Sequence, residues 1–225
     1  KLFSPHLRIP DLVIAGSHCV GLDAVAGRLA EAGIATRILA LGSLGGLQAL
    51  KRGEADVAPI HLLDAASGAY NAPFLSEGMR LVPGWRRLQG VVFRKGDARF
   101  EWRVAAEAAA AILADADALM VNRNQGAGTR TLIEGLLKGA RPPGYWNQPR
   151  SHNAVAASVA QGRADWGVAI RPIADAFGLG FLPLADEHYD FAVTTEPARA
   201  ESVAAFEAAL AAAREEIVAA GFEPA

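Results

Sequence analysis

Cysteine is almost absent from this chain of 225 residues, which contains only Cys19. A single cysteine excludes a disulfide framework and a cysteine metal cluster within the chain. It fits a reducing compartment, and we expect a cytoplasmic location, with the periplasm as the alternative. Apolar runs of about 18 residues are also missing, so no membrane span is expected.

A secretory signal pattern is missing too. Because Lys1 is not a natural start, the chain is expected either to have lost a leader or to be a fragment of a longer protein.

Charge of one sign is lacking as well, because the formal net charge is −2. Such a balance provides no overall basic field for nucleic acid or an acidic membrane. Apolar residues make up 52% of the chain and charged residues 20%, which is typical of a globular protein with a sizeable core.

Strand-like and helix-like patterns alternate through the first part of the chain. Strands are predicted at 12–15, 36–41 and 56–62, and helices at 21–32 and 44–53. This order is typical of a parallel sheet covered by helices.

The pattern recurs in the second half. A strand is predicted at 118–122, helices at 128–139 and 153–160, and a strand at 166–170. The segment Gly-Glu-Ala-Asp-Val-Ala at 53–58 resembles Gly-Arg-Ala-Asp-Trp-Gly at 162–167, which indicates a duplicated half.

These patterns predict two α/β lobes. Short strands are expected at 91–94, 181–184 and 191–195, and an Ala-rich helix at 201–219. Lobe I is predicted to comprise residues 1–90 with 186–225, and lobe II residues 91–185. Two adjacent crossings would make a hinge that permits closure on a ligand. Lobe II carries 11 Lys and Arg against 8 Asp and Glu, so it is the more basic lobe.

Three strand-to-helix turns, at 16–21, 42–46 and 122–130, combine small residues with hydroxyl, amide or guanidinium groups. Ligands of open α/β sheets bind beyond the carboxyl ends of strands, and helix N-termini favour anions. The turns therefore predict a site for a small anion, with Arg123 and Arg130 as charged donors. The same residues are also ordinary helix caps and turn formers, and this alternative stays open.

Histidines and aromatics have two interpretations each. His18, His61, His152 and His188 are candidate ligands or bases, but none form an i, i+4 pair, and a zinc site is not expected. Tyr189 fits either a pocket wall or the core.

The motifs together resemble one family of ligand-binding domains. The motifs that carry this resemblance are Gly16-Ser17-His18, Gly42-Ser43-Leu44-Gly45-Gly46, His61-Leu62-Leu63-Asp64, Asn122-Arg123, Gly126-Ala127-Gly128-Thr129-Arg130 and Ser151-His152-Asn153. The chain resembles, over about residues 11–195, the periplasmic-binding-protein-like domains fused to helix-turn-helix regulators or to molybdopterin-biosynthesis proteins. It is similar to molybdate- and tungstate-binding proteins of type II fold.

The resemblance implies an α/β, two-lobed, type II periplasmic-binding-protein-like fold. Each lobe would be a mainly parallel sheet flanked by helices, joined by a two-strand hinge. Two departures concern the ligand. Ala69 stands where the family commonly has Glu, and Ala127 where it often has Ser.

The ligand-binding residues expected from the turns and from the resemblance are Ser17, His18, Ser43, His61, Arg123, Gln125, Gly126, Gly128, Thr129, Arg130, His152 and Tyr189. No catalytic residue, metal ligand or cofactor is expected.

The favoured function is binding and sensing of a small anion by the effector domain of a regulator or cofactor-biosynthesis protein. The anion would be molybdate, tungstate or a molybdenum-cofactor-related species. A helix-turn-helix partner would lie outside this chain, and the oligomeric state is left open. The alternatives are the solute receptor of an ABC-type transporter and an enzyme using His18, Asp64 and His152.

Overall fold

The computed structural model describes residues 9–64, 66–101 and 103–225. Residues 1–8, which the sequence assigns to lobe I, lie outside the described residues. The chain divides into two compact units. Unit 1 comprises the described residues up to Arg86 together with His188–Ala225, and unit 2 comprises Arg87–Glu187. The sequence placed these boundaries at 90/91 and 185/186.

Unit 1 is built on a mixed sheet. Strands β2 (Thr36–Ala40), β1 (Leu12–Gly16) and β3 (Val57–Ile60) run parallel, and β7 (Gly180–Thr194) joins β3 antiparallel. Beyond β7 comes β4 (Met79–Phe93), which also pairs with the short β8 (Glu223–Pro224).

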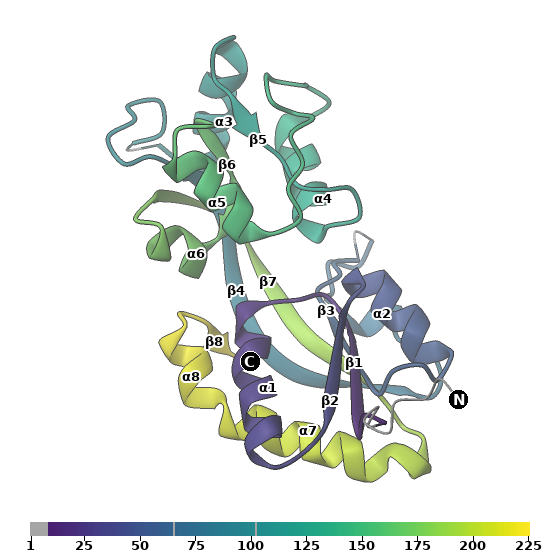
Figure 1. The fold of residues 1–225 in the computed structure, drawn as a ribbon. Helices are drawn as coiled ribbons and strands as arrows, with labels where there is room; N and C mark the ends of the chain where they lie inside the picture. The colour runs from purple at the N-terminus through teal and green to yellow at the C-terminus, as the bar shows by residue number, and fades with distance from the viewer. Residues whose placement is uncertain (1–8, 65, 102) are drawn as a thin grey trace, which may run out of the picture. The chain divides into compact units, whose positions relative to one another are not determined.

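Helices cover both faces of the parallel strands of unit 1. Val13 and Ala15 of β1 pack with Ala49 and Ala55, on the side of α2 (Gly42–Lys51). Since side chains alternate along a strand, the buried Leu12 and Ile14 face the opposite side. That side carries α1 (Val20–Glu31) and α7 (Ala200–Ala212), which pack on each other, and α8 (Arg214–Ala219) follows (Figure 1).

Unit 2 repeats this plan on a smaller sheet. The strand order is β7, β4, β6 (Trp166–Ile170) and β5 (Met120–Val121), with β5 parallel and β4 antiparallel to β6. The elements α3 (Ala105–Ala114) and α4 (Gly128–Leu137) enclose one core, and α5 (His152–Ala160) packs on β6. A short helix, α6 (Arg171–Ala176), follows β6 directly.

The internal repeat is visible in the hydrogen bonds. Gly53 after α2 and Gly162 after α5 both have positive φ, 69° and 71°, a left-handed conformation that favours glycine. Three residues later, each unit places an aspartate. Asp56 Oδ2 accepts the Val13 amide at 2.7 Å, and Asp165 Oδ2 accepts the Leu119 amide at 2.9 Å. Each carboxylate therefore ties a helix-to-strand turn to the neighbouring parallel strand.

Several predicted elements differ from the structure. The strands expected at 181–184 and 191–195 are one strand, β7, and the strand expected at 91–94 is the end of the longer β4. The segment between the two predicted strands is polar and does not show a strand pattern. Its residues Glu187 and Asp190 are nevertheless buried, where they pair with Arg87 and Asn71. The C-terminal helix divides at Ala213 into α7 and α8, and α3 and α6 were not predicted.

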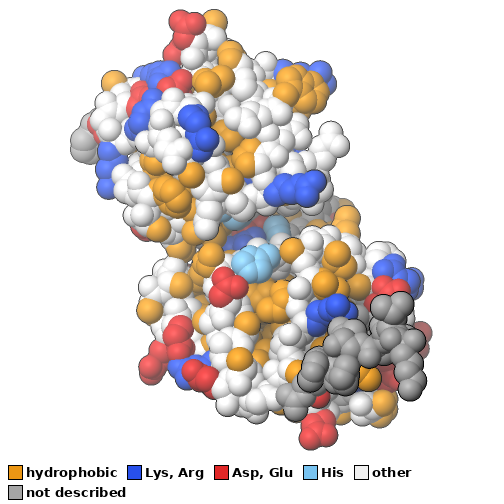
Figure 2. Space-filling model, viewed as in Figure 1, with side chains coloured by type: hydrophobic (Ala, Val, Ile, Leu, Met, Phe, Trp, Pro, Cys, Tyr) orange, Lys and Arg blue, Asp and Glu red, His pale blue; other side chains and the backbone are white. Residues whose placement is uncertain are grey.

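Charged side chains of both signs are dispersed over the visible surface of each unit (Figure 2). This distribution agrees with the small net charge. A preference for ligands of one sign must therefore come from local groups.

Close packing of α2 on β1 depends on Gly46. A Cβ atom at Gly46 would lie 2.3 Å from the Ala15 carbonyl oxygen, whereas a Cβ at Gly27 of α1 would meet nothing within 4 Å. We expect Gly46→Ala to lower the free energy of unfolding by about 1–3 kcal/mol through overpacking. Gly27→Ala, the matched control, should raise it by up to about 1 kcal/mol because alanine favours helix. Urea denaturation measures both, and equal midpoints for the two variants would contradict this account.

Candidate functional site

In unit 1, three of the expected site residues gather where parallel strands end. Ser17 follows β1, Ser43 lies in the first turn of α2 after β2, and His61 follows β3. Ser17 Oγ and His61 Nε2 are hydrogen-bonded at 2.7 Å, and the His61 amide donates to Ser43 Oγ at 3.2 Å. The sequence spread these residues over 45 positions, and the sheet brings them into one cluster, here called the Ser17–His61 cluster.

Tyr189 belongs to this cluster and to the core at once. Its ring is fully buried and stacks near that of His61, with 6.2 Å between centroids. Its hydroxyl donates to the Ser17 carbonyl oxygen. Tyr189 therefore holds the turn after β1 through the backbone of Ser17.

His18 points elsewhere. Its ring is exposed, and Nε2 lies 3.0 Å from Asp23 Oδ1 on the first turns of α1. The side chain of His18 is thus hydrogen-bonded to the helix that follows it, α1.

The loop after β3 is held by Asn71, whose role the sequence did not reveal. Asn71 is fully buried with φ 58°, and its Oδ1 accepts the Leu62 amide at 2.7 Å. Its Nδ2 donates to Asp190 Oδ2 at 2.7 Å, and Asp190 Oδ1 accepts the Gly84 amide at 3.1 Å. Two buried side chains, Asn71 at the end of the loop and Asp190 in β7, thereby fix the loop that carries His61.

Asp64 caps its own turn. Its Oδ2 accepts bonds from both the amide and the hydroxyl of Ser67. The hydroxyl bond is the main reason that the pKa of Asp64 lies below its usual range. The carboxylate is therefore engaged locally.

In unit 2, the turn after β5 is organised by the fully buried Asn122. Its Nδ2 donates to the Tyr145 carbonyl at 3.0 Å, and its Oδ1 accepts the Arg123 amide at 2.8 Å. Gln125 and Gly126 form the exposed tip, where Gly126 has φ 82°. Gly128 begins α4 and Thr129 is buried. The sequence predicted the turn, but not that Asn122 holds it.

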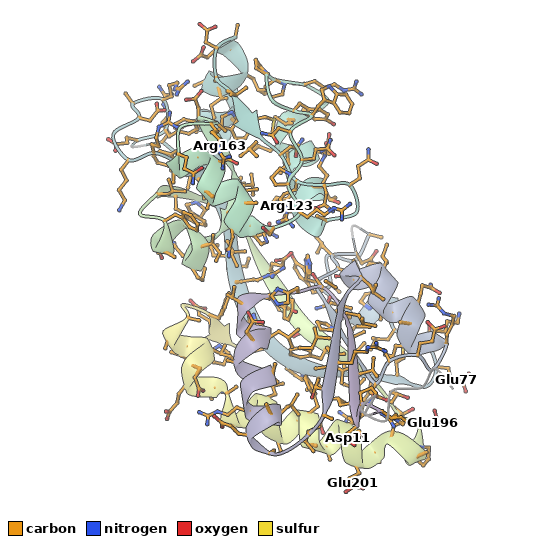
Figure 3. The ribbon with its side chains drawn as sticks, in the orientation of Figure 1. Asp11, Glu77, Arg123, Arg163, Glu196 and Glu201 are labelled. Atoms are coloured by element: carbon orange, nitrogen blue, oxygen red, sulfur yellow. The ribbon has the colours of Figure 1, made fainter. Side chains whose placement is uncertain are left out.

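Arg123 lies inside this turn, beside the start of α5 (Figure 3). Only 7% of the residue is exposed. Its Nη1 lies 3.1 Å from Nδ1 of His152, the first residue of α5, and Nη2 donates to the Arg150 carbonyl at 3.3 Å. Its buried Nε has no hydrogen-bond partner. Among the described residues, no carboxylate forms an ion pair with Arg123.

Burial lowers the pKa of Arg123 to about 10, and the nearby charge of Arg87 acts in the same direction, while Glu187 opposes both. A guanidinium with this pKa remains a cation at neutral pH. Its charge is desolvated and incompletely compensated, which is a costly state that a bound anion would relieve.

Arg130 has its partners within unit 2. Its Nε donates to Glu134, Nη1 donates to the Arg123 carbonyl at 3.0 Å, and its guanidinium lies 4.5 Å from the centre of the Tyr145 ring. Arg130 thus supports the turn that carries Arg123 through a charge that Glu134 already compensates.

Two further charged residues were missed by the sequence analysis. Arg87 in β4 and Glu187 in β7 form an ion pair with 2.5 Å between Nε and Oε2, and their side chains are 1% and 4% exposed. No local motif marks either residue, since they lie 100 positions apart.

Across the described ranges, no group of three or more His, Cys, Asp or Glu side chains is arranged to hold a metal ion. No helix in the described part of the chain has the length and apolar character to cross a bilayer.

Comparison with known sequences gives a family match and a relative. The model of the PBP superfamily domain matches residues 24–211. A Bacillus subtilis protein described as "Uncharacterized protein YvgK" is 33% identical over 165 residues, which cover 68% of this chain and 51% of the relative. The chain therefore spans about half the length of the curated relative that it matches.

Solved structures share the fold at low sequence identity. An ABC-type phosphate transport receptor from Vibrio cholerae is 15% identical with a TM-score of 0.66, covering 94% of this chain and 99% of that one. The tungstate-binding protein TupA from Desulfovibrio alaskensis is 18% identical, with a TM-score of 0.64 and coverage of 96% and 99%. The regulatory domain of MetR, a LysR family regulator from N. meningitidis, is 14% identical, with a TM-score of 0.65 and coverage of 95% and 99%.

The position of Arg123 should depend on Asn122. Asn122→Ala removes two buried hydrogen bonds and leaves the Tyr145 carbonyl unsatisfied, so we expect a loss of about 2–4 kcal/mol in the free energy of unfolding. The exposed Asn153 provides a control, and Asn153→Ala should change it by less than about 0.5 kcal/mol. Thermal denaturation of both variants tests this, and a neutral Asn122→Ala would show that the turn holds itself.

Proposed function

Because this chain belongs to the PBP superfamily of ligand-binding domains, with a type II periplasmic-binding-protein-like fold, we propose that it binds a small oxyanion through Arg123. The observation that carries the proposal is the buried guanidinium of Arg123, whose Nε has no hydrogen-bond partner and whose charge has no carboxylate partner in the described part of the chain. A tetrahedral oxyanion supplies both an acceptor and a negative charge, and such charge-assisted bonds are among the stronger hydrogen bonds.

Neighbouring groups of unit 2 would assist the anion. The N-termini of α4 and α5 begin at Gly128 and His152, close to Arg123 in the same unit. Free amides at a helix N-terminus favour anions. His152 accepts from Arg123 at Nδ1 when its ring is neutral, which leaves its proton on Nε2, where it serves as a donor.

Unit 1 carries donors of its own in the Ser17–His61 cluster. Hydroxyls of Ser17 and Ser43, together with the N-terminus of α2, offer further donors. We therefore propose that Ser17, Ser43 and His61 of unit 1 also bind an oxyanion, as the sequence predicts.

Candidate anions are molybdate, tungstate, phosphate and sulfate. Structural relatives named for phosphate and tungstate share the fold, and the resemblance drawn from sequence motifs favours molybdate or tungstate. Since the matched relative is about twice the aligned length, we propose that the domain reports binding to another module, as an effector domain does. A transport receptor is the competing role.

Arg123→Met tests the proposal. The variant keeps an apolar stem of similar length but removes the donors and the charge, so affinity for tungstate should fall about tenfold or more. Isothermal titration calorimetry of the wild type and the variant measures this, with molybdate, phosphate and sulfate as parallel ligands.

Arg163→Met is the matched control. Arg163 lies in the same unit and is exposed in the turn after α5, so this variant makes the same change in net charge away from the site (Figure 3). Its affinity should equal that of the wild type. Equal losses of affinity in both variants would mean that Arg123 acts only through its long-range charge. Unchanged affinity in Arg123→Met would exclude Arg123 from the site.

Participation of unit 1 is tested separately. Ser17→Ala removes the hydroxyl that bonds His61 while leaving the backbone bond to Tyr189 in place. We expect tungstate affinity to fall by about three- to tenfold, the effect of one neutral hydrogen bond. Ser67→Ala, in an exposed turn of the same unit, is the control. Identical affinities in Ser17→Ala and wild type would exclude the Ser17 hydroxyl from anion binding.

A further inference from the structure

The Arg87–Glu187 pair lies at the edge of the unit 2 sheet where the anion site is proposed. Strands β5 and β6 end at this edge, and β4, antiparallel to β6, enters there. Val121 at the end of β5 is level with Gly167, which pairs with Val92 of β4. Arg123 therefore follows β5 toward the part of β4 that begins with Arg87.

Both partners also end unit 2 along the chain. Arg87 is its first residue and Glu187 its last, and each belongs to a strand that continues into unit 1. The pair thus joins β4 and β7, which are neighbours in the sheet, through side chains that are almost fully buried.

The charges of this pair reach Arg123. Both act on its guanidinium, Arg87 against the charged form and Glu187 in favour of it. Charges that act on the Arg123 cation must act on an anion bound to it, with the opposite sign. In a buried environment this influence is weakly screened.

Resting on the proposed oxyanion site, we propose that Arg87 and Glu187 set its charge selectivity, with Glu187 opposing a second negative charge on the ligand. Glu187 cancels the charge of Arg87, so that the site presents one uncompensated guanidinium, that of Arg123. Neither residue needs to contact the ligand, and both act as positioning and charge-setting residues.

Tungstate and perrhenate form a suitable pair of probes. Both are tetrahedral oxyanions of four oxygens around a third-row metal and have similar size, but tungstate is a dianion and perrhenate a monoanion. A purely electrostatic change in the site must therefore alter the logarithm of the tungstate affinity twice as much as that of the perrhenate affinity.

Glu187→Gln removes the negative charge and keeps an oxygen that accepts from Arg87. If the Glu187 carboxylate and the bound anion are on the order of 10 Å apart, with an effective dielectric constant of about 25, loss of the charge should raise the perrhenate affinity about tenfold and the tungstate affinity about a hundredfold. Arg87→Gln should lower the affinity for both anions, and the logarithm of the tungstate affinity should fall twice as much as that of the perrhenate affinity. Calorimetry yields the affinities, and the fitted stoichiometry reports the folded fraction.

A double variant guards against poor folding of the single ones, because breaking a buried ion pair by removing one partner is destabilising. Arg87→Gln combined with Glu187→Gln removes both charges and leaves two amides that can bond each other. Its tungstate-to-perrhenate ratio should stay within about threefold of the wild-type ratio, since the net charge is unchanged.

The outcomes separate this inference from the proposed function. If the wild-type protein binds neither probe, this inference fails, and if it also binds none of molybdate, phosphate and sulfate, the proposed function fails with it. A second outcome is that Arg123→Met abolishes binding, while Glu187→Gln and Arg87→Gln change the affinities for tungstate and perrhenate by equal factors. In that case the role of the Arg87–Glu187 pair is structural, and only this inference fails. A double variant whose ratio shifts by tenfold or more would contradict it as well.

Discussion

Burial of the Arg123 guanidinium is the constraint on which the candidate site of unit 2 depends. Arg123 is almost fully buried, yet among the described residues its guanidinium is hydrogen-bonded only to a histidine nitrogen and a carbonyl oxygen, and its Nε has no acceptor. Transfer of such a charge from water is expensive, and folding alone does not compensate for it. The surrounding residues maintain this state. Asn122 fixes the backbone amide of Arg123, and Arg130 donates to its carbonyl while directing its own charge to Glu134.

The same hydrogen-bonding arrangement fixes the helix-to-strand turn before β3 in unit 1 and before β6 in unit 2. In both units a helix ends at a left-handed glycine, and an aspartate three residues later accepts an amide from the adjacent parallel strand. Arg199 binds Asp56 in unit 1, and Arg94 binds Asp165 in unit 2. These buried or half-buried pairs hold the amino ends of neighbouring parallel strands in register. The cluster of Ser17, Ser43 and His61 in one unit and the turn of Arg123 in the other follow such strands.

Local patterns were sufficient to predict most of the fold. Helix stops at Gly53 and Gly162, apolar strands and the repeated Gly-x-Ala-Asp motif are short-range signals, and each corresponds to an element of the structure. The turn 122–130 was also predictable, because strand-to-helix turns of a parallel sheet lie at one edge. The family resemblance placed both Arg123 and His152 at the site, and their side chains are in contact. Gathering of Ser17, Ser43 and His61 follows from the same rule.

Long-range pairing was not predictable from single positions. Asn71 and Asp190 are 119 residues apart, and each looks like a loop residue until β7 is seen to run through the polar segment. Arg87 and Glu187 are 100 residues apart and carry no motif. Both residues are buried because they lie in the long strands β4 and β7, whose polar middle parts hide the alternation of apolar and polar residues. Neither these continuous strands nor the charges that act on Arg123 could therefore be inferred from local sequence.

Anomalous diffraction at the tungsten edge, from crystals grown with tungstate, tests the central claim most directly. The account predicts an anomalous peak within hydrogen-bond reach of the Arg123 guanidinium, with an oxygen accepting from the free Nε. A well-occupied tungsten site elsewhere, with Arg123 Nε still unpartnered, would contradict it.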